Sequence, residues 1–186
     1  MIGYAFCGSF CTFKDSFEAL SLVKSKYLDI VPIMSFNAYN TDTRFGTSQE
    51  WIQKIETLCQ NKIINTIVDA EPLGPARPLD ALIIAPCTGN TLAKIANGIT
   101  DTPVCMAAKA HLRQDRPLII ALASNDAMSA NLANIAKLLT RKGVYFVPLR
   151  QDEPVKKPHS LVCDFGLLPD TLEKALKGEQ IRKLFL

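Results

Sequence analysis

Short apolar segments alternate with amphipathic segments along the whole chain, and this alternation limits the folds that are available. Apolar runs of the kind found in buried strands occupy residues 2–7, 29–34, 63–68, 79–85, 117–123 and 144–147. Apolar residues at helical spacing predict helices at about residues 13–26, 47–58, 90–97, 104–112, 126–143 and 169–177. Strands separated by helices form right-handed βαβ units, so we expect an α/β fold. The predicted architecture is a single-domain, doubly wound, mostly parallel sheet over residues 1–186, with helices on both faces.

Capping residues and turn formers set the expected boundaries of these elements. Thr12 with Asp15, and Thr47 with Glu50, have the spacing of capping boxes at the starts of the first two helices. Residues 124–126, with the sequence Ser-Asn-Asp, are expected to cap one long helix that ends near Gly143. Loops are expected at residues 35–46, 69–78 and 148–158, and residues 144–147 are expected to form the last strand.

Charge and cysteine usage argue against several classes of protein. The formal net charge is +3, and no run of five or six like charges occurs, so we expect no nucleic-acid partner. No apolar run approaches the roughly 20 residues of a membrane-spanning helix, so no membrane association is expected either. The N-terminus begins directly as a strand without the basic opening of a signal peptide, which predicts a cytoplasmic protein. The six cysteines form no Cys-x-x-Cys pair and the two histidines lie apart from them, so no metal site is expected.

The segment from Pro86 to Thr91 is the strongest indication of function. It ends a predicted strand, opens a predicted helix, and contains a proline, two threonines, a glycine and an asparagine. Three other predicted strands end in similar residues: Gly8-Ser9-Phe10-Cys11-Thr12, Ser35-Phe36-Asn37 and Ser124-Asn125-Asp126. For any one of these three loops alone, a set of helix N-caps is the favoured interpretation. In a parallel sheet, however, all four lie along one edge, where uncharged donors suit a neutral heterocycle with a phosphate tail.

Two further groups of residues have both a functional and a structural reading. Asp69 and Glu71 lie in a proline-rich loop before the strand at 79–85, which is either a substrate wall or a solvated connector. Lys109, His111, Arg113 and Arg116 form a basic group at the end of the helix at 104–112. This group is suited to a dicarboxylate, or it is a set of cations favoured by the dipole at a helix C-terminus.

Several segments resemble a known family. The run Ala85–Thr91, followed by Lys94–Asp101, resembles the Pro-Ala-Ser/Thr-Ala-Asn-Thr motif of the homo-oligomeric flavin-containing Cys decarboxylase superfamily. More narrowly, the chain resembles the B chains of bacterial dipicolinate synthase. This narrower resemblance is carried by residues 70–75 (Ala-Glu-Pro-Leu-Gly-Pro), 87–91 (Cys-Thr-Gly-Asn-Thr), 106–113, 124–126, 145–148 and 151–152.

The superfamily resemblance implies a Rossmann-like flavoprotein fold with FMN as cofactor. Transferred by position, the implied cofactor-binding residues are Gly8, Ser9, Cys11, Ser35, Cys87, Thr88, Asn90, Thr91, Ser124 and Asn125. The family's members are commonly trimers or dodecamers, so the resemblance also implies a homo-oligomer. The decarboxylases carry a catalytic histidine before the cofactor strand, whereas this chain has no histidine between residues 1 and 110. Decarboxylation of a cysteine peptide is therefore not expected.

The narrower resemblance implies a partner and a reaction. The partner is the A chain of dipicolinate synthase, with an NAD(P)-binding domain, and the product is dipicolinate, formed from a small cyclic dicarboxylate of the lysine branch. The resemblance also implies that the protein acts in the mother-cell cytoplasm of a sporulating bacterium. As a redox subunit, the chain would use Lys109 or Arg113 to bind a substrate carboxylate and Glu71 or Asp69 to take a ring proton. The alternatives are a non-catalytic partner of the A chain and an FMN-dependent decarboxylase.

Overall fold

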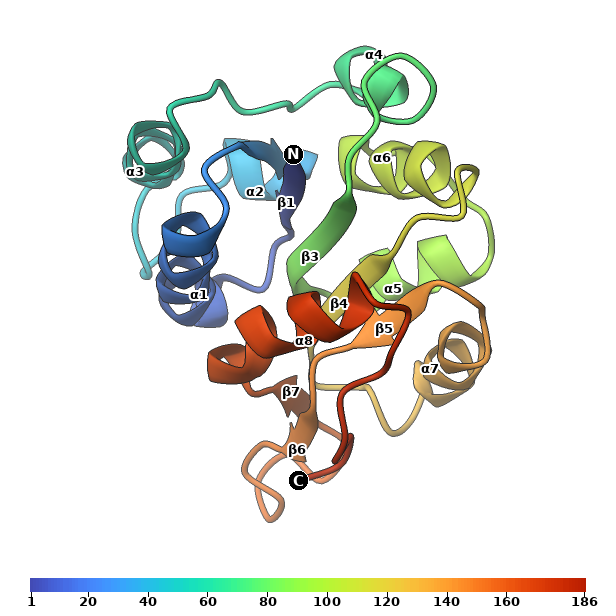
Figure 1. The fold of residues 1–186 in the computed structure, drawn as a ribbon. Coiled ribbons are helices and arrows are strands. Elements are labelled where there is room, and N and C mark those ends of the chain that lie inside the picture. The colour runs from blue at the N-terminus through green and yellow to red at the C-terminus, as the bar shows by residue number, and fades with distance from the viewer.

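The computed structural model describes residues 1–186 and contains a seven-stranded sheet with helices packed on it (Figure 1). Four parallel strands form its main part, in the order β2-β1-β3-β4, with β2 at one edge. Their bounds are β1 Ile2–Phe6, β2 Ile30–Met34, β3 Ala81–Cys87 and β4 Leu118–Ser124. The predicted mostly parallel α/β sheet is therefore confirmed.

The sheet divides beyond β4, because two different strands pair with the two halves of that strand. The first half pairs in parallel with β5 (Val144–Phe146), through Leu118 and Val144 among others. The second half pairs antiparallel with β7 (Leu161–Cys163), which in turn pairs with β6 (Leu149–Gln151). The β6–β7 hairpin lengthens the carboxyl edge of the sheet and corrects the expectation that residues 144–147 form the last strand and that 148–158 is a loop.

Helices cover both faces of the sheet, as predicted (Figure 1). One face carries α1, α3 and α8, with bounds Phe13–Lys26, Ser48–Cys59 and Leu168–Ala175. The other face carries α5, α6 and α7, with bounds Gly89–Ala96, Pro103–Leu112 and Leu132–Leu139. Two short helices, α2 (Phe36–Asn40) and α4 (Ile67–Ala70), lie in connections, and α4 packs on α6. No helix has both the length and the apolar character needed to cross a membrane.

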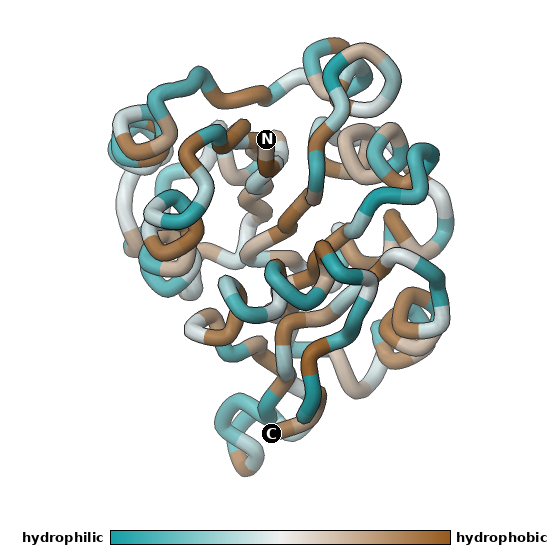
Figure 2. Tube along the Cα trace, viewed as in Figure 1, coloured by the Kyte–Doolittle hydropathy of each residue, from teal (hydrophilic) through white to brown (hydrophobic).

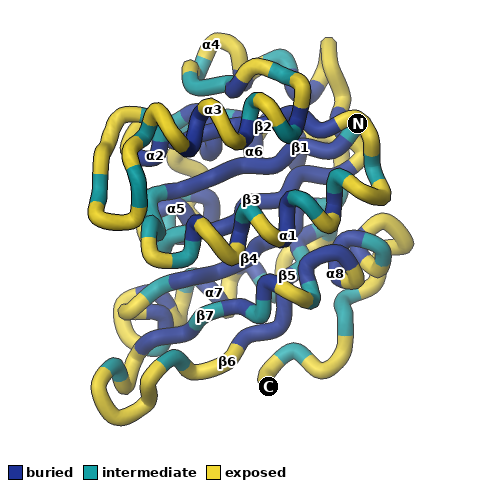
Figure 3. Tube along the Cα trace, turned by 90° about the vertical axis from the view of Figure 1, so that its left-hand side faces the viewer, coloured by how far each residue is buried: buried dark blue, intermediate teal, exposed yellow.

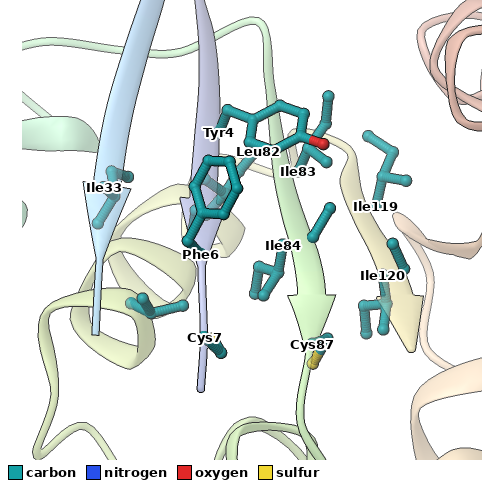
Figure 4. Packing of buried hydrophobic residues seen from close by; sticks show 14 of the residues in the cluster. Tyr4, Phe6, Cys7, Ile33, Leu82, Ile83, Ile84, Cys87, Ile119 and Ile120 are labelled. Carbon is teal, nitrogen blue, oxygen red and sulfur yellow. The ribbon is translucent and has the colours of Figure 1, made fainter. Parts of the chain in front are cut away.

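The core lies between the sheet and the two helical layers. Every residue of β1, β2 and β3 is buried, which is the expected consequence of helices on both faces. Apolar colour follows these strands through the middle of the molecule, and exposed positions lie on the outer sides of the helices (Figures 2 and 3). Side chains of neighbouring strands, such as Phe6, Ile84 and Ile120, gather in one cluster (Figure 4). This continuous core fixes the positions of the strand ends that carry the polar loops.

A buried polar contact joins α1 to the sheet. The Tyr4 hydroxyl donates to the backbone oxygen of Ser16 at 2.8 Å, and the Ser16 hydroxyl donates to the backbone oxygen of Ala85 at 2.6 Å. Both side chains are fully buried, and burial raises the pKa of Tyr4 well above its ordinary value. Each polar group therefore has a partner, as burial requires. The contact holds the N-terminal part of α1 against the end of β3, beside the Pro86–Thr91 segment.

The predicted strand at residues 63–68 is wrong. Only Ile64 pairs with the sheet, through a single bridge to Ile33, and residues 67–70 form α4. The Thr66 hydroxyl accepts the backbone N–H of Asp69 and so caps this helix at its start. The Ile- and Val-rich composition indicated a strand, but the cap and the packing of α4 on α6 stabilise a helix instead.

Three other boundary predictions also need correction. The long helix expected up to Gly143 begins only at Leu132, because residues 125–131 form turns around Asp126. The capping box of Thr12 with Asp15 does not form, since the Thr12 hydroxyl donates to the backbone oxygen of Ser9. The expected loop at 35–46 contains α2. The capping box of Thr47 with Glu50 is confirmed, and it lowers the pKa of the Glu50 carboxyl through hydrogen bonds from Thr47.

A buried histidine makes the stability of the fold depend on pH. The His111 Nε2–H donates to the backbone oxygen of Pro117 at 2.8 Å, while Nδ1 is buried with no partner. Burial lowers the pKa of His111 below its ordinary 6.5. The unfolded chain therefore binds a proton at a pH where the folded chain does not, and the free energy of unfolding should fall as pH drops below about 6.5. Urea unfolding at stepwise pH should show this loss in the wild-type chain and a smaller one in His111→Gln; parallel curves for the two would contradict it.

Candidate functional site

A pocket of about 350 Å³ opens at the carboxyl ends of β1, β2 and β3. The residue or residues that follow each of the three strands contribute to its walls, as does the segment between α5 and α6. The lining residues are Gly8, Ser35, Phe36, Asn37, Thr88, Asn90, Thr91, Lys94, Asp101 and Thr102. Five of the predicted cofactor-binding residues are among them: Gly8, Ser35, Thr88, Asn90 and Thr91. With the strand order 2-1-3-4, the ends of β1 and β3 are the topological switch point, where open α/β sheets bind ligands.

The Thr88 side of the pocket is the start of helix α5. The Thr88 hydroxyl accepts the backbone N–H of Thr91 at 3.2 Å and lies 3.1 Å from the Thr91 hydroxyl. This cap uses one N–H of the first turn, and those of Gly89 and Asn90 have no intrahelical acceptor. Asn90 is exposed at the pocket. The free N–H groups and the helix dipole make this end of α5 suitable for an anion.

The Ser35 side of the pocket is built in the same way. The Ser35 backbone N–H donates to the backbone oxygen of Phe6 at 3.0 Å, which joins the end of β2 to the end of β1. The Ser35 hydroxyl accepts the N–H of Ala38 at 3.3 Å and caps α2. Phe36, 41% exposed, presents an apolar ring at the pocket. The pocket thus combines hydroxyl and amide groups with an aromatic ring.

One ion pair is part of the pocket wall. The ammonium group of Lys94, in the second turn of α5, lies 2.9 Å from the Asp101 carboxylate, which precedes α6. The Lys94 side chain is 21% exposed, whereas that of Asp101 is 58% exposed. Lys94 is the only cation among the lining residues, and its charge is paired with the more exposed Asp101 carboxylate in the same wall.

The other five predicted cofactor-binding residues do not line this pocket. Ser9 and Cys11 follow Gly8 but turn into a 3-10 segment, where the Ser9 hydroxyl receives a hydrogen bond from Thr12. Cys87 is fully buried in β3, at the same end of the sheet as Cys7 (Figure 4). Ser124 ends β4 and Asn125 begins the turn after it, and the Ser124 hydroxyl lies behind Gly89, the first residue of α5. Direct contact of these five residues with a ligand in the pocket stays a prediction.

The turn after β4 packs against Gly89, and this contact explains the glycine. A Cβ at Gly89 would lie 2.6 Å from both the Ser124 hydroxyl and the Asn131 amide nitrogen, and 2.8 Å from an Asp126 carboxylate oxygen. Ser124 and Asn131 both donate to the Asp126 carboxylate. Ser124 therefore supports the pocket from behind by holding the acidic turn against the first residue of α5.

Cysteine reactivity should divide sharply between one exposed and five buried thiols. Cys11 is exposed, whereas the other five cysteines are buried. Burial raises the pKa of Cys7 to about 12 and that of Cys59 to about 11, so neither forms the reactive thiolate near neutral pH. Titration of the native protein with a disulfide reagent should therefore modify one thiol per chain rapidly, and all six in denaturant. Cys11→Ser should abolish the rapid phase; rapid labelling that persists in this variant would contradict the prediction.

None of the four predicted catalytic residues reaches the pocket within one chain. Asp69 and Glu71 are exposed near α4, and the Asp69 carboxylate accepts a hydrogen bond from the Thr66 hydroxyl. Lys109 and Arg113 line a different pocket, on the outer side of α5 and α6. The structure thus separates the predicted acid–base and carboxylate-binding residues from the strand ends.

The sequence patterns did not single out several lining residues. Phe36 and Asn37 stand in the predicted Ser-Phe-Asn strand end, so their place in the pocket follows from the same signal. Lys94 and Asp101 lie within the motif at 85–101, but only the fold of the α5–α6 connection brings them together. Thr102 caps α6 ahead of Pro103, which is a recognisable helix start, although this signal does not indicate a ligand.

Comparisons with known proteins agree with this geometry. Residues 4–173 match the family model described as Flavoprotein. The chain is 43% identical over 185 residues to the dipicolinate synthase B chain of Bacillus subtilis, covering 100% of this chain and 92% of the relative. It is 40% identical, with a TM-score of 0.91, to the crystal structure of the dipicolinate synthase B chain from Bacillus halodurans, covering 100% of this chain and 95% of the other.

A more distant structure shows how widely the fold is shared. A dodecameric FMN-dependent Ubix-like decarboxylase from Escherichia coli O157:H7 aligns with a TM-score of 0.63 and 22% identity over 80% of each chain. At this identity the likeness concerns the fold alone. The family match and the two full-length similarities carry the assignment: the chain belongs to the Flavoprotein family and is a homologue of the B chain of dipicolinate synthase.

Proposed function

We propose that the strand-end pocket binds FMN. The observation that carries this proposal is the convergence of Gly8, Ser35 and Thr88, from three separate strand ends, on one pocket at the β1/β3 switch point. Membership of the Flavoprotein family and the FMN-dependent relative with the same fold support it.

The residues present suit a flavin and its phosphate. The free N–H groups at the start of α5, with the hydroxyls of Thr88 and Ser35, are donors for phosphate oxygens. Asn90 and Asn37 have amide groups that can both donate to and accept from the polar edge of a flavin ring. Phe36 offers an apolar face. Ser9 and Ser124 would in addition shape the loops around this site. Direct contacts of FMN with these two residues and with Cys11, Cys87 and Asn125 are also part of the proposal.

The proposed activity is that of an oxidoreductase subunit that helps form dipicolinate from a dihydrodipicolinate-type dicarboxylate. This reaction removes two electrons and two protons from the ring, and FMN, when bound, can accept electrons. The relatives are named as the B component of a synthase, which supports an A-chain partner, and in this proposal that partner carries NAD(P). We also propose, from the same homology, that the protein acts in the mother-cell cytoplasm during sporulation.

A homo-oligomer, a trimer or a dodecamer, is also part of the proposal. The dodecameric relative with the same fold supports assembly of this kind. Assembly bears on the chemistry, because Asp69 and Glu71 do not reach the pocket of their own chain. A proton-accepting role for either residue would require the pocket of a neighbouring copy.

A second candidate is a non-catalytic partner of the A chain, and the separation of the four predicted catalytic residues from the pocket favours it. An absorption spectrum of the purified protein distinguishes the two. The redox proposal predicts a yellow protein with flavin bands that bleach when the A chain and the dicarboxylate substrate are added. A colourless protein that does not bind added FMN, yet increases the activity of the A chain, would overturn the proposal in favour of the second candidate.

A further inference from the structure

Residues 180–186, here called the C-terminal segment, run along an open edge of the sheet. Among the strands, β5 pairs only with β4 and β6 pairs only with β7, so both are edge strands. In Figure 1 the C-terminal segment passes from the end of α8 by β5 and ends beside β6. The segment therefore lies where a further strand would otherwise pair with the sheet.

The side chain of Gln180 takes the place of a neighbouring strand at β5. The Phe146 backbone N–H donates to Oε1 of Gln180 at 2.9 Å, and Nε2 of Gln180 donates to the Phe146 backbone oxygen at 2.7 Å. Both backbone groups of Phe146 point away from β4, because the next residue, Val147, donates to Ile120 of β4 and successive residues of a strand face opposite neighbours. One primary amide can donate and accept at once, so Gln180 satisfies both outward groups of Phe146.

The end of the C-terminal segment does the same for β6 through its backbone. The Leu149 N–H donates to the backbone oxygen of Leu184 at 2.8 Å, and the Leu186 N–H donates to the backbone oxygen of Leu149 at 2.9 Å. Phe185 thus lies opposite Leu149, as in a parallel pair of strands. The segment therefore supplies hydrogen-bond partners at both edge strands, although it is itself not a regular strand.

We propose that the C-terminal segment prevents the β5–β6 edge from pairing with the same edge of a second copy of this chain. An open edge offers N–H and C=O groups to other strands, and two identical edges can pair around a two-fold axis. The segment replaces these groups with a surface that carries Arg182 and Lys183, which are both exposed. It contains no acidic residue, so two copies of this surface repel each other.

The proposal does not depend on FMN, because none of these residues lines the strand-end pocket. It concerns association beyond the oligomer that the wild-type chain forms. The second copy is the partner that the charge argues for, since like charges on identical surfaces guard specifically against self-association.

The first measurement is hydrogen exchange in Gln180→Ala, followed by mass spectrometry on peptides that contain Phe146. In dilute protein the Phe146 amide should exchange about tenfold faster than in the wild type, because its acceptor is lost. Gln53→Ala is the matched control, since Gln53 is an exposed glutamine of α3, and it should leave this exchange unchanged. Unchanged exchange at Phe146 in Gln180→Ala would overturn the proposal.

The second measurement is sedimentation velocity of the double variant Gln180→Ala/Leu186→Pro. Proline at position 186 removes the N–H that the Leu149 oxygen accepts, whereas the control Leu186→Ala keeps it. The double variant should form species larger than the wild-type oligomer, in a share that rises with protein concentration. Gln53→Ala and Leu186→Ala should sediment as the wild type does.

Hydrogen exchange within the larger species locates the contact. Phe146 should exchange slowly again there, because a strand of the second copy would accept its N–H. Leu186→Pro alone removes one hydrogen bond at the edge of the molecule, so it repeats the test should the double variant not fold, with a smaller share of larger species. Absence of larger species from a folded variant would overturn the proposal. Larger species in which Phe146 still exchanges fast would also overturn it, because they would place the association on another surface.

Discussion

Replacing Gly74 with alanine should lower the free energy of unfolding by about 3 kcal/mol, because the added Cβ would overpack a contact between two backbones. It would overlap the carbonyl oxygen of Ala110 and lie only 2.8 Å from its carbonyl carbon. A backbone carbonyl inside α6 cannot turn away as a side chain can, so the segment at 71–74 and α6 must separate. For a chain of this length the melting temperature should fall by roughly 10 °C, which scanning calorimetry would detect.

Gly8→Ala is the matched control for this experiment. The nearest atoms to a Cβ at Gly8 lie at 3.6 Å, which is an ordinary contact distance. We expect its free energy of unfolding to change by less than about 1 kcal/mol. If Gly74→Ala were as stable as Gly8→Ala, the close packing of the 71–74 segment on α6 would be refuted.

Asn90→Asp should weaken FMN binding by about a hundredfold, equivalent to roughly 2.7 kcal/mol. The proposed site puts the phosphate at the start of α5, where Asn90 is exposed, and a carboxylate there repels a phosphate. The same carboxylate interacts favourably with the helix dipole, so the stability of the fold should not decrease. Fluorescence titration of the flavin-free protein with FMN would measure the change in affinity.

Riboflavin and Asn90→Ala give this prediction its controls. Riboflavin has no phosphate, so its affinity should change much less than that of FMN in Asn90→Asp. The alanine variant removes the amide without adding charge, and its loss of FMN affinity should be smaller. Equal losses for FMN and riboflavin would contradict a phosphate at this end of α5.

Sequence patterns predicted the elements whose signals are local. The segment from Pro86 to Gly98 reads as a strand end, a Thr cap, a short helix and a glycine stop, and the structure has each of them in place. The prediction at 63–68 failed because a short Ile- and Val-rich stretch cannot be assigned to a strand or to a helical segment by periodicity alone. The helix expected after residue 126 failed because Asp126 is held by Ser124 and Asn131 instead of starting a helix. Only the approach of this turn to Gly89, far away in sequence, makes that arrangement evident.

The residues of the strand-end pocket likewise divide into those with a local sequence signal and those that only the fold brings there. Ser35 and Thr88 could be predicted because each directly follows an apolar strand, although the helix that Ser35 caps was not predicted. Asp101 could not, since it reaches the pocket only through the turn that joins α5 to α6 and through its ion pair with Lys94. The predicted basic group at the end of α6 holds only in part, because Lys109 and Arg113 line one pocket, whereas His111 is fully buried and Arg116 donates to the backbone oxygen of Leu79. The distance of Lys109 and Arg113 from the strand-end pocket depends on which face of α6 they occupy. Periodicity does not set that orientation for a helix whose residues are mostly buried.

The division of the sheet beyond β4 has a consequence for synthesis on the ribosome. The second half of β4 gains its neighbour only when Leu161–Cys163 is available, since Ala123 pairs with Val162 and Ser124 with Leu161. A nascent chain that has reached residue 150 can assemble the parallel strands, but the edge of β4 at Ala123 and Ser124 is still unpaired. An unpaired strand edge can form hydrogen bonds with strands of other chains. The hairpin that emerges late thus closes the interval during which a growing chain is most exposed to aggregation.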